Sequence, residues 1–180
     1  MRILITGNPS YQGLTQGIVR TSESGIECIG RYNGWDINDV EKIADYAKNF
    51  EIFINSQYGP DGQQLKILEA VYKKFGTGHI INISSTSSYW GDGSSEDYIR
   101  NKTHLDDVSK RLCKNICWGP SSIRITNIAF GQLASEGQQK RKDGRKKISL
   151  EEAGKIVKWV IDSPNTYNIH YISLDPIQTS

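Results

Sequence analysis

Apolar residues recur along this chain at two alternating spacings. Short β-branched runs such as residues 2–6, RILIT, are typical of buried strands. Between these runs, apolar residues return every three or four positions, which is typical of amphipathic helices. Strands are predicted over 2–6, 26–30, 51–55, 79–84, 122–130 and 168–173, and helices over 13–24, 38–50, 63–76, about 95–116 and after Ser149.

The alternation of strands and helices predicts the fold class. Successive β-α-β units build a mostly parallel sheet with right-handed crossovers, so we expect a three-layer α/β protein with helices on both faces of six to seven strands. Asn38 with Glu41, and Ser149 with Glu152, have capping-box spacing at two helix starts. The 180 residues suit one domain, 1–180. Ligands of such sheets bind beyond the carboxyl ends of the strands, so functional residues should follow strands.

Composition narrows the possible partners. The formal net charge is only +2, which makes nucleic acid an improbable partner and does not suggest a membrane. No apolar run approaches the roughly 20 residues of a membrane span, and the amino terminus lacks a secretory pattern. The odd cysteine count predicts small apolar residues rather than a disulfide framework or a metal site, and a cytoplasmic location. The cysteines are Cys28, Cys113 and Cys117.

Two loops offer dinucleotide contacts. Glycines at 7, 13 and 17 follow the first strand and run into a helix, where they either let a pyrophosphate approach or simply end the strand. Arg31 ends the second strand, where an arginine suits an adenosine 2′-phosphate; a solvated surface arginine is the alternative. Asp36 would either cap a helix or line an adenine pocket.

Tyr98 and Lys102 carry the strongest chemical signal. At about 100° per residue, Lys102 falls near Tyr98 and Leu105 on the apolar stripe of its helix. A buried lysine needs a partner, although a snorkelling surface lysine remains possible. A nearby ammonium lowers the pKa of a phenol from about 10, which makes the phenol a useful acid or base. Ser85 ends a strand thirteen residues upstream.

The serine, the Tyr-x-x-x-Lys pair and the preceding IINISS resemble the short-chain dehydrogenase/reductase family. The segments LITG, WDIND, FINSQYG and SIRITNIAFG resemble further family motifs in the same order, over roughly residues 2 to 175. The resemblance implies a Rossmann fold, NADP or NAD as cofactor, and interconversion of a carbonyl and an alcohol by hydride transfer. The implied catalytic residues are Ser85, Tyr98 and Lys102, and the implied cofactor contacts are Gly7, Asn8, Gly13, Leu14, Arg31, Asp36, Ile37, Asn55, Tyr98 and Lys102.

The resemblance also implies a place for the substrate and an assembly. A small carbonyl or alcohol substrate would bind between the 86–96 loop, with Tyr89 and Trp90, and the segment after Gly131. A homo-oligomer, either a dimer or a tetramer, would form through the helices that start near Gln63 and Ser95.

The chain departs from the family pattern in several places. It is short: a helix and most of a strand between Arg31 and Asp36 are missing, NSQYG lacks the usual Ala-Gly, and no asparagine can be placed in the catalytic set. A non-catalytic dinucleotide-binding or regulatory protein and a nucleotide-sugar epimerase-like enzyme therefore stay as alternatives. The basic run 138–147 is predicted to be a solvated loop. Its cations are Lys140, Arg141, Lys142, Arg145, Lys146 and Lys147.

Overall fold

Six parallel strands form one sheet in the order β2-β1-β3-β4-β5-β6. The computed structural model describes residues 1–22, 25–91, 94–119, 121–141 and 143–178. The predicted α/β class, the strand count and the parallel arrangement are confirmed. The strands are β1 (Ile3–Thr6), β2 (Ile26–Ile29), β3 (Ile52–Asn55), β4 (Gly78–Ser85), β5 (Ile123–Phe130) and β6 (Tyr171–Leu174).

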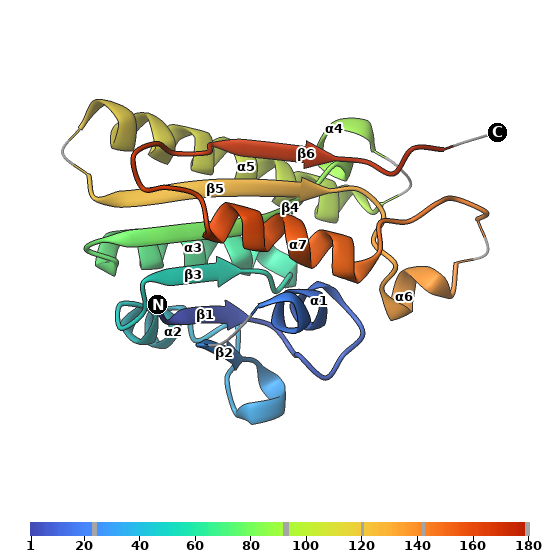
Figure 1. The fold of residues 1–180 in the computed structure, drawn as a ribbon, viewed down its shortest axis with the longest axis horizontal. Helices are drawn as coiled ribbons and strands as arrows, with labels where there is room; N and C mark the ends of the chain where they lie inside the picture. The colour runs from blue at the N-terminus through green and yellow to red at the C-terminus, as the bar shows by residue number, and fades with distance from the viewer. Residues whose placement is uncertain (23–24, 92–93, 120, 142, 179–180) are drawn as a thin grey trace.

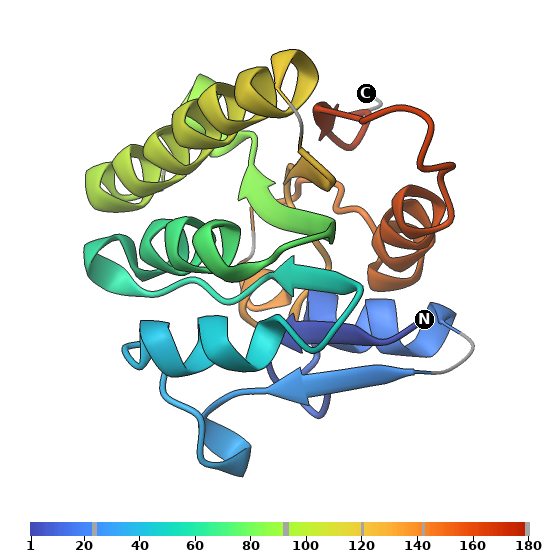
Figure 2. The same cartoon turned by 90° about the vertical axis from the view of Figure 1, so that its left-hand side faces the viewer.

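Helices cover both faces of this sheet and make three layers (Figures 1 and 2). The layer formed by α2, α3 and α5 lies on one face, and α1 and α7 pack together on the other. The helices are α1 (Leu14–Thr21), α2 (Val40–Ala47), α3 (Gln63–Lys74), α4 (Ser87–Trp90), α5 (Glu96–Trp118), α6 (Glu136–Gln139) and α7 (Leu150–Ile161), with 3₁₀ turns η1 (Arg31–Asn33) and η2 (Pro60–Gly62).

Alternating side chains of the strands build two separate cores. Leu4, on β1, packs in the core beneath α2, α3 and α5, whereas its neighbours Ile3 and Ile5 pack in the core beneath α1 and α7. Because both faces are covered, the strands are apolar on both sides, as expected for a parallel sheet.

Helices α1 and α7 touch through glycines. A Cβ atom at Gly17 would lie 2.1 Å from the carbonyl oxygen of Leu150, and one at Gly154 would lie 2.4 Å from the carbonyl oxygen of Gly17. Such a contact admits no side chain at either position. Gly17 therefore serves helix packing, whereas its place in the sequence suggested the phosphate loop.

Several predicted helix and strand boundaries differ from the structure by a few residues, and two of these differences have a side-chain cause. Helix α2 begins at Val40, and the Asn38 side chain does not cap it, because it bonds to Asp36 and Gln63 instead. The capping box of Ser149 and Glu152 at α7 is confirmed.

The last strand starts at Tyr171 rather than at 168. Asn168 Oδ1 accepts the backbone N–H of Ile125 at 3.1 Å, and Asn168 Nδ2 donates to the carbonyl oxygen of Ile125 at 3.0 Å. These two bonds take the place of bonds from a neighbouring strand. This side-chain amide thus closes the ladder before β6 begins.

The shortening predicted after β2 is confirmed. Only the 3₁₀ turn η1 and a short loop separate β2 from α2, so β2 is an edge of the sheet. Among the described helices, none is both long and apolar enough to cross a membrane. Of the three free cysteines, Cys113 is buried and Cys28 half-buried, but Cys117 is exposed, so the prediction of an apolar packing role is wrong for Cys117.

Candidate active site

A cavity of about 730 Å³ lies at the carboxyl ends of the strands. The loops after β1, β3, β4 and β5 and the first turns of α5 form its walls, on the side of the sheet where the arrowheads point in Figure 1. The chain runs outward from β1 to β2 and then returns to β3, so the order reverses between β1 and β3. A ligand site is expected at such a reversal.

Ser85, Tyr98 and Lys102 all line this cavity, as predicted. Ser85 is the last residue of β4, and Tyr98 lies in the first turn of α5. The Ser95 side chain caps that helix by accepting the backbone N–H of Tyr98 at 3.3 Å. Lys102 follows one turn later, so the cap sets where both side chains enter the cavity.

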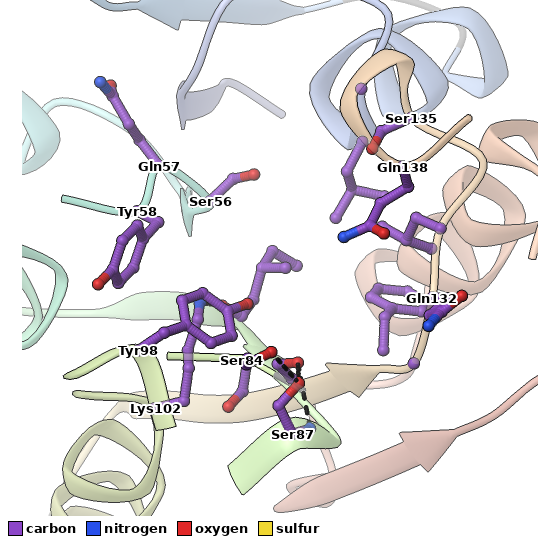
Figure 3. Close-up of a pocket in the computed structure, with 18 of the residues that line it drawn as sticks. Ser56, Gln57, Tyr58, Ser84, Ser87, Tyr98, Lys102, Gln132, Ser135 and Gln138 are labelled. Carbon is purple, nitrogen blue, oxygen red and sulfur yellow. Dashed lines mark hydrogen bonds between the residues drawn. The ribbon is translucent and has the colours of Figure 1, made fainter. Parts of the chain in front are cut away.

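The Lys102 ammonium is buried and bonded. Only 3% of the residue is exposed, which confirms its predicted place on the buried face of α5. Nζ donates to Gln64 Oε1 and to the carbonyl oxygen of Ile83, both at 2.8 Å. It lies 5.5 Å from the ring centroid of Tyr98 and 5.8 Å from that of Tyr58. Figure 3 shows these side chains on one wall of the cavity.

Burial sets the proton affinity of this lysine. Loss of solvent lowers the pKa of Lys102 to about 8, and the negative charge of Asp106 opposes the shift. The ammonium thus places a positive charge beside the Tyr98 ring.

Ser85 is held by a short hydroxyl chain. Its Oγ donates to Ser87 Oγ at 3.0 Å and accepts the backbone N–H of Ser87 at 3.2 Å. Ser88 Oγ bonds to the carbonyl oxygen of Ser85 at 2.8 Å and to Asp106 Oδ2 at 3.0 Å. Burial raises the pKa of the Asp106 carboxyl, although the hydrogen bonds that the carboxyl accepts act to lower it. The serine is thereby fixed by groups on β4, α4 and α5.

The glycine loop forms the opposite end of the cavity. Asn8, Gly13 and Leu14 line it, whereas Gly7 does not. Gly7 instead closes the turn: a Cβ atom there would lie 2.1 Å from Thr15 Oγ1, and its φ of +157° disfavours other residues. Gly13 starts α1 and no side chain caps that helix.

The remaining predicted cofactor contacts lie outside the cavity wall. Arg31 is exposed at the start of η1. The residue before it, Gly30, lies beside the turn after β1, since a Cβ atom there would be 3.6 Å from the carbonyl oxygen of Gly7. Asp36 Oδ1 accepts the backbone N–H of Asn38 at 2.9 Å. Ile37 packs in the core, and Asn55 is buried beneath the site.

The third wall follows β5. Gln132, Ser135 and Gln138 face the tyrosines across the cavity in Figure 3. Tyr89 and Trp90, which the sequence places at the substrate, do not line it. Tyr89 stacks edge-on against Tyr171 instead, with ring centroids 6.0 Å apart. The aromatic part of the predicted substrate pocket is therefore absent from this cavity.

Most described cations of the basic run are exposed, as expected for a solvated loop, but two of them pair with carboxylates. Lys140 pairs with Glu136 at 2.8 Å, and Lys147, whose side chain is 13% exposed, pairs with Asp143 at 3.2 Å. Arg141 lines the cavity, and Lys142 lies outside the described residues. The prediction of a solvated loop is wrong for Lys147.

Solved structures share this architecture. Serine dehydrogenase from Escherichia coli aligns with a TM-score of 0.68 at 17% identity, covering 97% of each chain. A closed serine dehydrogenase complexed with NADP+ gives 0.74 at 16%, covering 97% of this chain and 94% of that one. A short chain dehydrogenase from Burkholderia cenocepacia in complex with NADP gives 0.75 at 16%, covering 96% and 89%.

The chain has the short-chain dehydrogenase/reductase fold. No family model matches the sequence, and no curated protein sequence matches it. The fold is therefore shared at a sequence identity of 16–17%, where only a few motifs can be recognised.

The residues of this short-chain dehydrogenase/reductase fold fit a dinucleotide. The first turn of α1 has no side-chain cap, so its backbone N–H groups remain for an anion such as a pyrophosphate. Gly13 leaves room for the Tyr11 ring, because a Cβ atom at Gly13 would lie 3.2 Å from that ring. The Lys102 ammonium has a third N–H besides the two that bond to Gln64 and Ile83, and this donor suits a ribose hydroxyl.

Sequence reasoning missed Gln64, Tyr58 and Asp106. Tyr58 stands in NSQYG, where the short-chain dehydrogenase/reductase motif has a small residue, and its ring meets that of Tyr98 at 4.9 Å. Asp106 follows Lys102 by four residues, a spacing that could have indicated a buried counter-charge on α5. Nothing in the local sequence marks Gln64.

Proposed function

We propose that the protein is an NAD(P)-dependent oxidoreductase of the short-chain dehydrogenase/reductase type, which interconverts a carbonyl and an alcohol. One observation carries this proposal. Ser85, Tyr98 and Lys102 come from two different elements and line one cavity at the carboxyl ends of the strands. Solved structures that align with this chain at TM-scores of up to 0.75 are complexes with NADP+ or NADPH. This likeness supports the choice of cofactor.

Each residue of this set has a chemical role. A bound nicotinamide would supply or accept the hydride. The Ser85 hydroxyl would turn its one O–H from Ser87 Oγ to the carbonyl oxygen. The Tyr98 hydroxyl would transfer a proton to that oxygen as it gains charge. The Lys102 ammonium would stabilise the resulting phenolate from beside the Tyr98 ring.

The cofactor would lie between the glycine loop and Lys102. Asn8, Gly13 and Leu14, together with the open first turn of α1, would hold the pyrophosphate. Arg31 would pair with an adenosine 2′-phosphate, because it follows β2 and is exposed. NADP is therefore the proposed cofactor, with NAD as the weaker ligand. Gly7, Asp36, Ile37 and Asn55 would shape the pocket from behind.

Two measurements test the function. NADPH and NADH are titrated against the protein by fluorescence, and a panel of small aldehydes, ketones and hydroxy compounds, including serine, is then followed at the NADPH absorbance. We expect NADPH binding on the order of micromolar and turnover of at least one compound. The matched variant Tyr98→Phe should bind NADPH similarly but lose turnover. Binding without any turnover would favour a non-catalytic dinucleotide-binding protein, and no binding of either nucleotide would refute the proposal.

The same proposal covers the organisation of the chain. Residues 1–180 would act as one cofactor-binding domain, and free cysteines suit a cytoplasmic location. A homo-oligomer through α3 and α5 would have to bury a charged face, so sedimentation should decide between a dimer and a monomer. The exposed charged residues and histidine of that face are Lys66, Glu69, Lys73, His104, Asp107, Lys110, Arg111 and Lys114.

A further inference from the structure

The Lys102 ammonium is bonded to a neutral side chain instead of a carboxylate. Gln64, the second residue of α3, is 4% exposed and accepts from Lys102 Nζ at 2.8 Å through Oε1. A buried cation is usually paired with an anion or fully hydrogen-bonded. Here an amide oxygen and the Ile83 carbonyl supply the bonds.

The orientation of the Gln64 amide is fixed by its other bonds. Its Nε2 donates to the carbonyl oxygens of Asn55 at 2.7 Å and Ile83 at 2.9 Å. Both N–H bonds of the amide are thus used on acceptors that cannot become donors. A flipped amide would place its oxygen against those two carbonyls, so Oε1 must face the ammonium.

The charged and titratable groups around the ammonium are few. Tyr98 and Asp106 face it from α5, and Tyr58 faces it from the loop after β3. From α3 it meets the neutral amide of Gln64, and from β4 only a backbone carbonyl. Burial thus holds the pKa of Lys102 at about 8, because no carboxylate touches the ammonium.

We propose that Gln64 is a positioning residue for this site, which holds the Lys102 ammonium beside Tyr98 and, being neutral, leaves that lysine able to titrate. The proposal rests on the proposed function for its catalytic meaning, but the contact itself belongs to the free protein. A carboxylate in the same place would lock the lysine in its charged form.

The test measures the titration of Lys102 directly. Protein labelled with ¹³C at lysine Cε is titrated by NMR without cofactor, and the Lys102 signal is assigned by its loss in Lys102→Met. Gln64→Leu removes the hydrogen bond to the charged form, so the pKa of Lys102 should fall by about one to two units. Gln64→Glu adds an opposite charge, so the pKa should rise by about one unit or more.

Gln63 provides the matched control. It is the neighbouring buried glutamine of α3, and its Nε2 donates to Asn38 Oδ1 at 3.1 Å. Gln63→Leu and Gln63→Glu should leave the Lys102 titration within about 0.3 units of the parent. If the Gln64 variants shift it no more than these controls do, the proposal is wrong. If Gln64→Leu does not fold, the test rests on whether the pKa of Lys102 rises in Gln64→Glu.

Turnover gives a second, separable readout. If the proposed function holds, the pH dependence of turnover should shift in opposite directions in the two Gln64 variants and stay unchanged in the Gln63 variants. If no carbonyl is reduced by any form, the proposed function fails while the NMR result still stands. If the pKa of Lys102 shifts in both Gln64 variants but the pH dependence of turnover does not, the positioning role is refuted.

Discussion

The burial of Lys102 predicts a stability that rises with pH. In the folded protein the pKa of Lys102 is about 8, whereas the ordinary value is 10.5. At pH values between 8 and 10.5, Lys102 of the unfolded chain still holds a proton that Lys102 of the folded chain has released. Because stability rises with pH wherever the unfolded state binds more protons, Lys102 should stabilise the fold progressively above pH 8.

The size of this effect follows from the shift. One pKa unit corresponds to about 1.36 kcal/mol, and a group that titrates near 8 instead of 10.5 contributes about 2.5 kcal/mol between pH 7 and pH 10. Other groups oppose this trend, because burial raises the pKa of Cys28 and Cys113 to about 11 and that of Tyr171 further. Total stability will therefore not show the effect by itself.

A difference measurement isolates it. Urea unfolding of the parent and of Lys102→Met at pH 7, 8, 9 and 10 gives two stability curves, and the cysteine and tyrosine contributions cancel in their difference. We expect the parent to gain about 2.5 kcal/mol relative to Lys102→Met across this range. Lys110→Met, on the solvent face of the same helix, is the control and should show no such trend. A flat difference for Lys102→Met would refute a buried, titrating lysine.

Three further predictions concern the site and the packing beneath it. Tyr98→Phe should lower turnover by about 10²–10⁴-fold, because the acid–base group is lost, with little change in the NADPH dissociation constant measured by fluorescence. Arg31→Ala should weaken NADPH by about tenfold or more and NADH by much less, since only NADPH carries the 2′-phosphate. Gly17→Ala should lower the free energy of unfolding by about 1–3 kcal/mol or more, because the added methyl meets the Leu150 carbonyl. Gly76→Ala, where a Cβ atom meets nothing within 4 Å, should change it by about 0.5 kcal/mol at most in urea unfolding.

Each of these has an opposing outcome. Full turnover in Tyr98→Phe would make that tyrosine only an aromatic wall of the cavity. Equal weakening of both nucleotides by Arg31→Ala would remove it from the 2′-phosphate. Equal stability of the Gly17 and Gly76 variants would mean that α1 and α7 separate without cost.

The order of strands and helices could be predicted from the sequence, because it depends on local periodicity. A strand buried on both faces needs a continuous apolar run, and a helix needs a stripe, so each element is visible within a few residues. The helix that carries Tyr98 and Lys102 could be predicted for the same reason. Boundaries that depend on side chains were less predictable: Asn38 bonds to Gln63 and leaves α2 uncapped.

The candidate site was most directly predictable where its residues share one element. Tyr98 and Lys102 lie one turn apart on α5, so their spacing alone brings them together. Arg31 could be predicted to follow a strand, but whether it touches a ligand depends on a loop whose course the local pattern does not fix. Tyr89 and Trp90 were placed at the substrate, yet both lie on α4 and neither lines the cavity.

The layered sheet, the cavity at the carboxyl ends of the strands and the spacing of Tyr98 and Lys102 could be predicted from the sequence, because each follows from periodicity and strand order. The surroundings of the lysine depend on long-range packing instead. Gln64 lies 38 residues before Lys102, and the buried row Asn55, Asn82 and Asn127 forms across three strands in register. These contacts join elements that are far apart in the chain, so their geometry exists only once the sheet has fixed which residues stand side by side.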